Sequence, residues 1–321
     1  MAARDPRSEA QRLLIPGLVA RVLEPSPPAV GPPWFADDPV KDGDVPPGHR
    51  VVAPVPLPGA LTWDEWLADN HEHAEFVSAR WLGAHRRLTV APASYSDTRL
   101  ALHRVAVYVV SPARRLANGK IGLRWTLDGF GTPVFGEGEQ VRVEGDRVVL
   151  QRGETVASHP MSTLAGLADF VLGGKPDLAG AEGFDVPPTG DPEADLRVDP
   201  VAARFLGDWF GFAYSVLEEL RADPASVDPG RVQLWPEHFD AAVDCGPDGR
   251  RSMFGASPGD DAVIEPYLYA LPPAGTPPGE LWNATSFRGA ILPLSDMVHA
   301  SDQRAAALAF LRERRDAVAG A

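Results

Sequence analysis

The residues best suited to chemistry lie in two short segments of the second half of the chain. The first runs from Trp235 to Asp244, and strand alternation would place His238 and Asp240 on one face of it. An imidazole near a carboxylate can exchange protons close to neutral pH. We therefore expect Asp240 to act as a base or polar anchor, and His238 as a proton donor or acceptor.

The second segment supplies further carboxylates and two phenols. Asp260 precedes it, and Glu265, Tyr267 and Tyr269 would share one face of the strand that follows. If this strand lies beside the first, these groups meet and form a pocket for a small polar ligand. In that arrangement Glu265 is a second candidate base, and Trp235, Asp260, Tyr267 and Tyr269 bind the ligand. The alternative interpretation is a buried hydrogen-bond network without a catalytic role.

A serine between these segments matches a catalytic motif only as text. Residues 255–259 read Gly-Ala-Ser-Pro-Gly, the G-x-S-x-G pattern of a nucleophile elbow. In that elbow the amide after the serine helps to bind the oxyanion, whereas Pro258 has no N–H to donate. The pattern therefore predicts a proline-glycine turn between strands.

Cofactor motifs are missing from the sequence. Lys120 and Lys175 each follow a glycine, but the upstream glycine and the following Ser or Thr of a phosphate-binding loop are missing. Residues 69–73, Asp-Asn-His-Glu-His, could pair metal ligands four residues apart on a helix, although a solvated helical face explains them as well. We expect no cofactor and no bound metal.

Composition narrows the class of protein further. The chain has 321 residues, with 30 Lys and Arg against 44 Asp and Glu, so its net charge is −14. This balance argues against nucleic acid and anionic membranes as partners. Cys245 is the only cysteine, which excludes an intrachain disulfide and fits a reducing cytoplasm. No apolar run reaches the roughly 18 residues of a membrane-spanning helix.

Hydrophobic spacing and capping residues predict an α+β protein with mainly antiparallel sheets and flanking helices. A proline-rich arm would cover 1–60, a first half 61–175, a linker 176–198 and a second half 199–321. The predicted helices cover 63–83, 162–172, 200–223 and 302–318. The predicted strands cover 106–110, 121–127, 141–144, 147–150, 232–235, 239–243, 265–271 and 287–292. Each half then reads helix, strands, helix, which suggests two related units.

Several short motifs follow one another along the second half of the chain. They are Asp199-Pro200, the W-x-x-x-F-D run of Trp235, Phe239 and Asp240, the loop of Gly255, Pro258, Gly259 and Asp260, the E-P-x-x-Y run of Glu265, Pro266 and Tyr269, and an alanine-rich last helix. In this order they resemble an uncharacterised bacterial family described only as a domain of unknown function. The resemblance covers about 199–318, and it implies an architecture and a site but no reaction.

Two functions of different classes follow from these observations. The first is an enzyme or small-molecule binder that uses the carboxylate, histidine and tyrosine cluster of the second half. The second is a non-catalytic protein that binds a partner or associates with itself as a homo-oligomer. Convergence of Asp240, Glu265 and Tyr269 in a sheltered hollow would favour the first function.

Overall fold

The computed structural model describes residues 88–126, 129–133, 135, 139–152, 155–181, 183–230, 232–247, 250–276 and 279–319. The predicted arm at 1–60, the helix at 63–83 and the acidic and histidine run at 69–73 lie outside the described residues.

The first half opens with one continuous helical run. It consists of α6 (Tyr95–Val105), a π-helical turn η4 (Ala106–Val110) and α7 (Ser111–Asn118). The strand predicted at 106–110 is therefore wrong. The residues of η4 are all buried, so the β-branched apolar run reflects burial on every side of a helix and not a strand. Gly119, with φ 77°, ends α7 in the left-handed conformation.

An antiparallel meander and a helix complete this half. Its sheet has the order β1-β2-β3-β4-β5, and α8 (Leu164–Leu172) follows. The strands are β1 (Arg124–Thr126), β2 (Gly129–Gly131), β3 (Glu139–Glu144), β4 (Arg147–Arg152) and β5 (Thr155–Pro160). The hairpin predicted around Gly145 is confirmed, since Glu144 pairs with Arg147 and Gly145 has φ 58°.

The second half begins with the longest helix described, α9 (Pro200–Ala222). Its predicted start is confirmed, because the Asp199 carboxylate accepts hydrogen bonds from the backbone N–H groups of Val201 and Ala202. The strands are β6 (Gln233–Trp235), β7 (Asp240–Cys245), β8 (Ser252–Ser257), β9 (Tyr267–Leu271) and β10 (Ala290–Pro293). They form a second antiparallel meander, followed by α10 (Leu294–Met297) and α11 (Gln303–Ala319).

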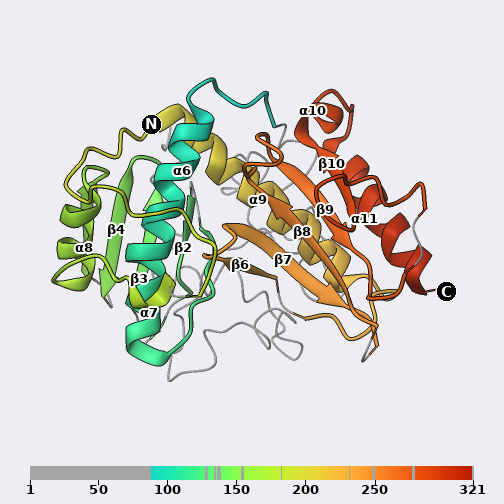
Figure 1. The fold of residues 1–321 in the computed structure, drawn as a ribbon, viewed down its shortest axis with the longest axis horizontal. Helices are drawn as coiled ribbons and strands as arrows, with labels where there is room; N and C mark the ends of the chain where they lie inside the picture. The colour runs from blue at the N-terminus through green and yellow to red at the C-terminus, as the bar shows by residue number, and fades with distance from the viewer. Residues whose placement is uncertain are drawn as a thin grey trace, which may run out of the picture.

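The two halves have the same plan: a helix, five antiparallel strands, then a helix (Figure 1). This confirms the α+β class and the two related sheet halves. The sheets meet at one bridge, where Leu123 and Leu234 each donate a backbone hydrogen bond to the other, with N···O distances of 2.7 and 2.9 Å. Helix α9 contacts strands of both sheets and also α6.

Aromatic rings close the core between the halves. Phe130 comes from β2, Phe210 from α9 and Phe239 from the turn before β7, and their centroids lie 5.1–6.2 Å apart in edge-to-face pairs. The segment predicted as a linker follows the surface of this core, and the Leu196 N–H donates to the Ser162 carbonyl. Among the described helices, none combines the length and apolar character needed to cross a bilayer.

Candidate functional site

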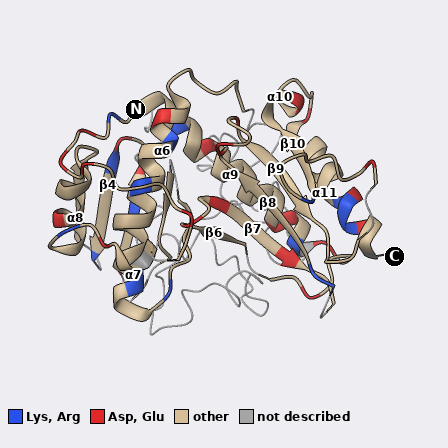
Figure 2. Cartoon of the chain, in the orientation of Figure 1, with Lys and Arg blue, Asp and Glu red and all other residues tan. Residues whose placement is uncertain are grey.

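The candidate site lies on the face of the second sheet that points away from the main core. Alternate residues of β7 divide between the two faces: Ala241 and Val243 join the main core, whereas Ala242 joins a separate small cluster with Tyr267 and Tyr269. Asp240 begins β7, and the ribbon is red near both ends of this strand (Figure 2). The outer face of the sheet therefore combines aromatic rings with a carboxylate.

The two strands expected to be neighbours are separated by one strand. β8 lies between β7 and β9, so the expected pairing is wrong. The side chains still meet because Gly255 of β8 leaves room for the ring of Tyr269. A Cβ atom at Gly255 would overlap Cζ and Oη of that ring and lie 2.6 Å from its Cε1. The phenol thus crosses β8, and its hydroxyl donates a hydrogen bond to Oδ2 of Asp240.

Asp240 is the most perturbed carboxyl of this face. Its side chain is 8% exposed, and no described residue donates a hydrogen bond to its Oδ1. Burial raises the pKa of Asp240 to about 6, although the hydrogen bond from Tyr269 and the nearby His238 act in the opposite direction. A carboxyl with this pKa exchanges its proton close to neutrality, which is the property of a general base.

The other predicted carboxylate of the face, Asp260, organises a loop. Its Oδ1 accepts hydrogen bonds from the N–H groups of Ala262 and Val263, both at 2.8 Å. Its Oδ2 accepts from the Tyr267 hydroxyl at 2.5 Å. Burial and this carboxylate raise the pKa of Tyr267. Both Asp260 oxygens are therefore engaged, and Tyr267 is fixed beside Tyr269 with ring centroids 6.3 Å apart.

The proline-glycine turn is anchored to the first half. Ser257 ends β8, and its hydroxyl accepts a hydrogen bond from the Gly259 N–H. The carbonyl of Pro258 accepts from the Tyr95 hydroxyl at 2.8 Å, and the carbonyl of Gly259 accepts from Arg99. This geometry is that of a structural turn, because the chain after Ser257 enters a loop and not a helix.

The other predicted site residues differ in how they lie relative to this pair. His238 is exposed in the turn before β7, where Phe239 has φ 55° and interrupts the expected alternation. Glu265 binds Ser295 at the start of α10, accepting from its N–H at 2.7 Å and its hydroxyl at 2.8 Å. Trp235 is half-buried and pairs with Asp240 in the register of β6 and β7. The structure thus brings together Asp240, Tyr269, Tyr267 and Trp235.

Sequence reasoning missed a half-buried histidine between the halves. His103 of α6 stacks on Phe239, with centroids 4.9 Å apart and planes 8° from parallel, and its Nε2 lies 2.9 Å from the Pro236 carbonyl. Burial lowers the pKa of His103 to about 4, so the ring is neutral at pH 7 and donates its Nε2 proton to that carbonyl. The sequence cue for this residue was its position close to the apolar run 106–110, which was predicted to be a strand and is helical.

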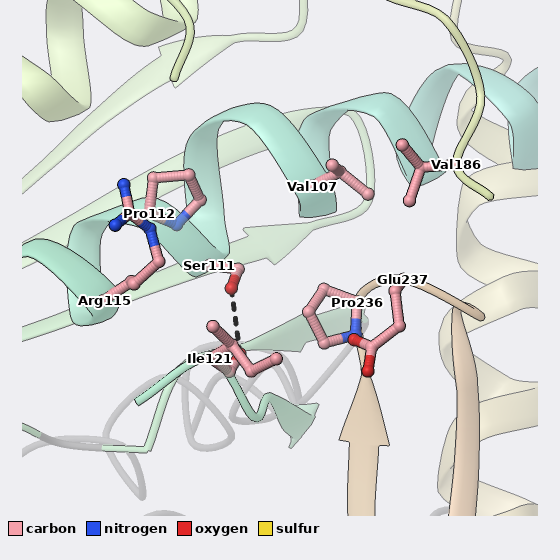
Figure 3. A pocket seen from close by; sticks show the side chains of 8 residues that line it. All are labelled: Val107, Ser111, Pro112, Arg115, Ile121, Val186, Pro236 and Glu237. Atoms are coloured by element: carbon pink, nitrogen blue, oxygen red, sulfur yellow. Dashed lines mark hydrogen bonds between the residues drawn. The ribbon is translucent and has the colours of Figure 1, made fainter. Parts of the chain in front are cut away.

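A small cavity lies near this histidine (Figure 3). Its lining comes from η4, α7, the segment after α7, the segment predicted as a linker and the turn between β6 and β7: Val107, Ser111, Pro112, Arg115, Ile121, Val186, Pro236 and Glu237. Arg115 already pairs with Asp177, and the Ser111 hydroxyl donates to the Ile121 carbonyl. Arg115 and Ser111 therefore serve the fold, whereas Oε2 of Glu237 is buried and receives no hydrogen bond from a described residue.

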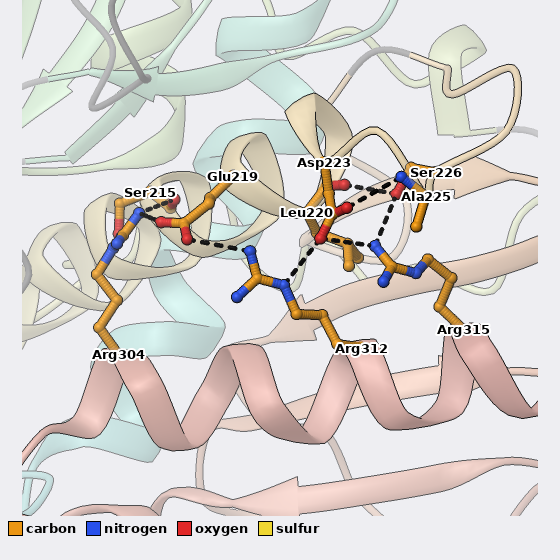
Figure 4. A network of polar contacts seen from close by, with 9 residues as sticks. All are labelled: Ser215, Glu219, Leu220, Asp223, Ala225, Ser226, Arg304, Arg312 and Arg315. Carbon is orange, nitrogen blue, oxygen red and sulfur yellow. Dashed lines mark hydrogen bonds and ion pairs between the residues drawn. The ribbon is translucent and has the colours of Figure 1, made fainter. Parts of the chain in front are cut away.

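The densest ionic network is also structural (Figure 4). Three arginines of α11 reach two carboxylates near the end of α9, at N···O distances of 2.5–3.2 Å. The residues are Glu219, Asp223, Arg304, Arg312 and Arg315. The ion pairs run along the contact between the two helices, so they fix α11 against α9. In the described part of the chain, no group of three or more His, Cys, Asp or Glu side chains could hold a metal ion.

The fold and this face define a duplicated α+β protein with a buried carboxylate held by a phenol. Comparisons with family models, curated proteins and solved structures found no match for this chain. The resemblance to a bacterial family of unknown function therefore stays a prediction, and the functional argument rests on the site itself.

Proposed function

We propose that the protein binds a small polar ligand on the outer face of its second sheet, with Asp240 as the anchor. The observation that carries this proposal is the buried Oδ1 of Asp240, which receives no hydrogen bond from a described residue. A buried polar atom without a partner costs about 1–3 kcal/mol. Because Oδ1 is buried, a ligand reaches it only by displacing side chains that cover it. A ligand that then donates a hydrogen bond there recovers this free energy, so the unpaired atom favours ligands with an N–H or O–H group.

The neighbours of Asp240 suit an acid–base role as well as binding. The Tyr269 hydroxyl holds Oδ2, so the carboxylate is oriented and only Oδ1 remains to accept a proton from a ligand. A pKa near 6 leaves this carboxylate mostly ionised at pH 7, as a base requires. Trp235 and Tyr267 supply aromatic surface beside it. The site therefore supports a binder, and an enzyme if the ligand loses a proton to Asp240.

The test is a thermal-shift screen with small amines, amino acids, sugars and hydroxy acids at pH 7. We expect at least one class to raise the melting temperature of the wild type and to lose that effect in Asp240→Asn, which keeps the side-chain shape. Glu265→Gln is the matched control, since Glu265 binds Ser295 away from the site. Equal shifts in the wild type and Asp240→Asn would show that the ligand binds elsewhere.

A further inference from the structure

The outer edge of the first sheet is open for pairing. β5 is the last strand of that sheet, it pairs with β4 alone among the described strands, and all its residues except His159 are exposed. Val156 is 50% exposed. Natural proteins block such edges with charged side chains, prolines, bulges or covering segments. The stretch 155–159 reads Thr-Val-Ala-Ser-His and carries neither a proline nor an acidic, lysine or arginine side chain.

The equivalent edge of the second sheet is blocked. At β10 the side-chain amide of Asn283 imitates a neighbouring strand: it donates to the Ile291 carbonyl at 3.1 Å and accepts from the Ile291 N–H at 2.9 Å. Pro293 ends β10 without a donor, as Pro160 does at the end of β5, so the Asn283 amide is what distinguishes the two edges. The two related halves thus differ at the one feature that controls association through strands.

The register shows which backbone groups of β5 point outward. Pro160 lies opposite Arg147 and has no N–H, so this pair cannot exchange two hydrogen bonds. Opposite pairs alternate between bonded and non-bonded along an antiparallel ladder. The N–H and C=O groups of Val156 and Ser158 therefore point away from β4. The Arg147 guanidinium donates hydrogen bonds to the hydroxyl and the carbonyl of Ser158. This contact agrees with a Ser158 carbonyl that points away from the ladder with β4.

We propose that this edge pairs with β5 of a second copy of the chain, antiparallel and centred on Ala157. In that register the outward groups of Val156 meet those of Ser158 in the second copy, and the same contact repeats across the two-fold axis. Four backbone hydrogen bonds result, and the two Ala157 methyl groups are small enough for the close approach at the axis. Because the β10 edge is blocked, association stops at a closed dimer and does not continue into a fibre.

The size and charge of this interface set its strength. A pairing of five residues buries less than the about 1,200 Å² of a standard stable interface, so the dimer is reversible, with a dissociation constant of about 10–100 µM. Each copy carries a net charge of −14, so repulsion opposes association and salt strengthens it. This proposal is independent of the ligand site, because β5 belongs to the other sheet.

Sedimentation velocity from about 1 µM to about 1 mM, at low and at moderate salt, tests the proposal. We expect a reversible monomer–dimer equilibrium in the wild type. Ser158→Pro removes an outward N–H without touching the ladder to β4, and it should weaken the dimer at least about tenfold. Ser158→Ala, which keeps the N–H, is the matched control and should dimerise like the wild type.

A second variant covers the case in which the proline disturbs folding. Val156→Lys places a charge at the exposed edge and should weaken association in the same way, while circular dichroism and melting stay unchanged. A wild type that stays monomeric throughout the concentration range would overturn the proposal, even if it bound an added strand-forming peptide. A dimer that survives in both Ser158→Pro and Val156→Lys would place the interface elsewhere.

Discussion

Replacing Gly255 by alanine should break the link between Tyr269 and Asp240. A methyl group at this position overlaps Cζ and Oη of the Tyr269 ring, which is buried between the strands. The ring has to move, and its hydroxyl then leaves Oδ2 of Asp240. A hydrogen bond to a charged group contributes about 1.5–3 kcal/mol, and overpacking a buried site costs about 1–3 kcal/mol. Since the moving ring relieves part of the overlap, we expect a total loss of about 3 kcal/mol.

Urea unfolding at pH 7.5 measures this loss, and a double-mutant cycle separates its two parts. In a Tyr269→Phe background both the hydrogen bond and the overlapping Oη atom are gone, so Gly255→Ala should cost only the remaining overlap with the ring carbons, about 1–2 kcal/mol. Gly174→Ala is the control, because its methyl group would meet no atom within 4 Å. The reasoning is refuted if Gly255→Ala costs under about 0.5 kcal/mol, or the same in both backgrounds.

Three further changes test the electrostatic and capping arguments. Burial lowers the pKa of His103 to about 4, so on acidification the unfolded chain is protonated first, and the free energy of unfolding falls between about pH 6.5 and 4. Burial raises the pKa of Asp240 to about 6, so the folded chain is protonated first, and this residue's contribution to the free energy of unfolding rises as the pH falls from about 6 to 4. In urea titrations across this window, Asp240→Asn should therefore steepen the acid destabilisation and His103→Gln should reduce or reverse it. Burial alone would raise the pKa of Asp223, but the Ala225 N–H and the Arg315 guanidinium lower it to about 2. Asp223→Asn should therefore cost about 1 kcal/mol at pH 7 and clearly less at pH 2, where the unfolded chain is protonated and the folded carboxyl is about half protonated. Thr163→Ala removes the acceptor of the Gly166 N–H at the start of α8 and should cost about 1 kcal/mol in thermal unfolding; an unchanged melting temperature would show that this cap is dispensable.

Local signals in the sequence predicted the features that depend on neighbouring residues. Asp199 before a proline marked the start of α9, and glycine at 145 marked the hairpin, because caps and tight turns are decided within a few positions. The strand at 106–110 failed because β-branched residues suit any fully buried environment. The strand β8 was missed because Ser257-Pro258-Gly259 indicated a turn, and that turn begins only at the end of the strand.

The candidate site was predicted in its residue types but not in its geometry. Asp240 and Tyr269 do meet, although the reason lies in Gly255, a residue of an intervening strand that no pattern in β7 or β9 reveals. His238 lies in an exposed turn beside the site and not on the strand face, because the positive φ of Phe239 breaks strand alternation before β7. Glu265 left it because the start of α10 needs an acceptor for its free N–H groups, and that need depends on a segment thirty residues away.

The bridge between Leu123 and Leu234 joins two similar units within one polypeptide. Identical subunits of a symmetric pair must tolerate every substitution twice, once on each side of the axis. A tandem chain escapes that constraint, so its two outer sheet faces are free to diverge. In the first sheet the buried Arg142 forms an ion pair with Glu144 and donates hydrogen bonds to Gln140 and Gln151, while the second sheet carries a carboxylate and phenols. The covalent connection therefore lets one molecule hold two chemically different polar groups on a repeated scaffold.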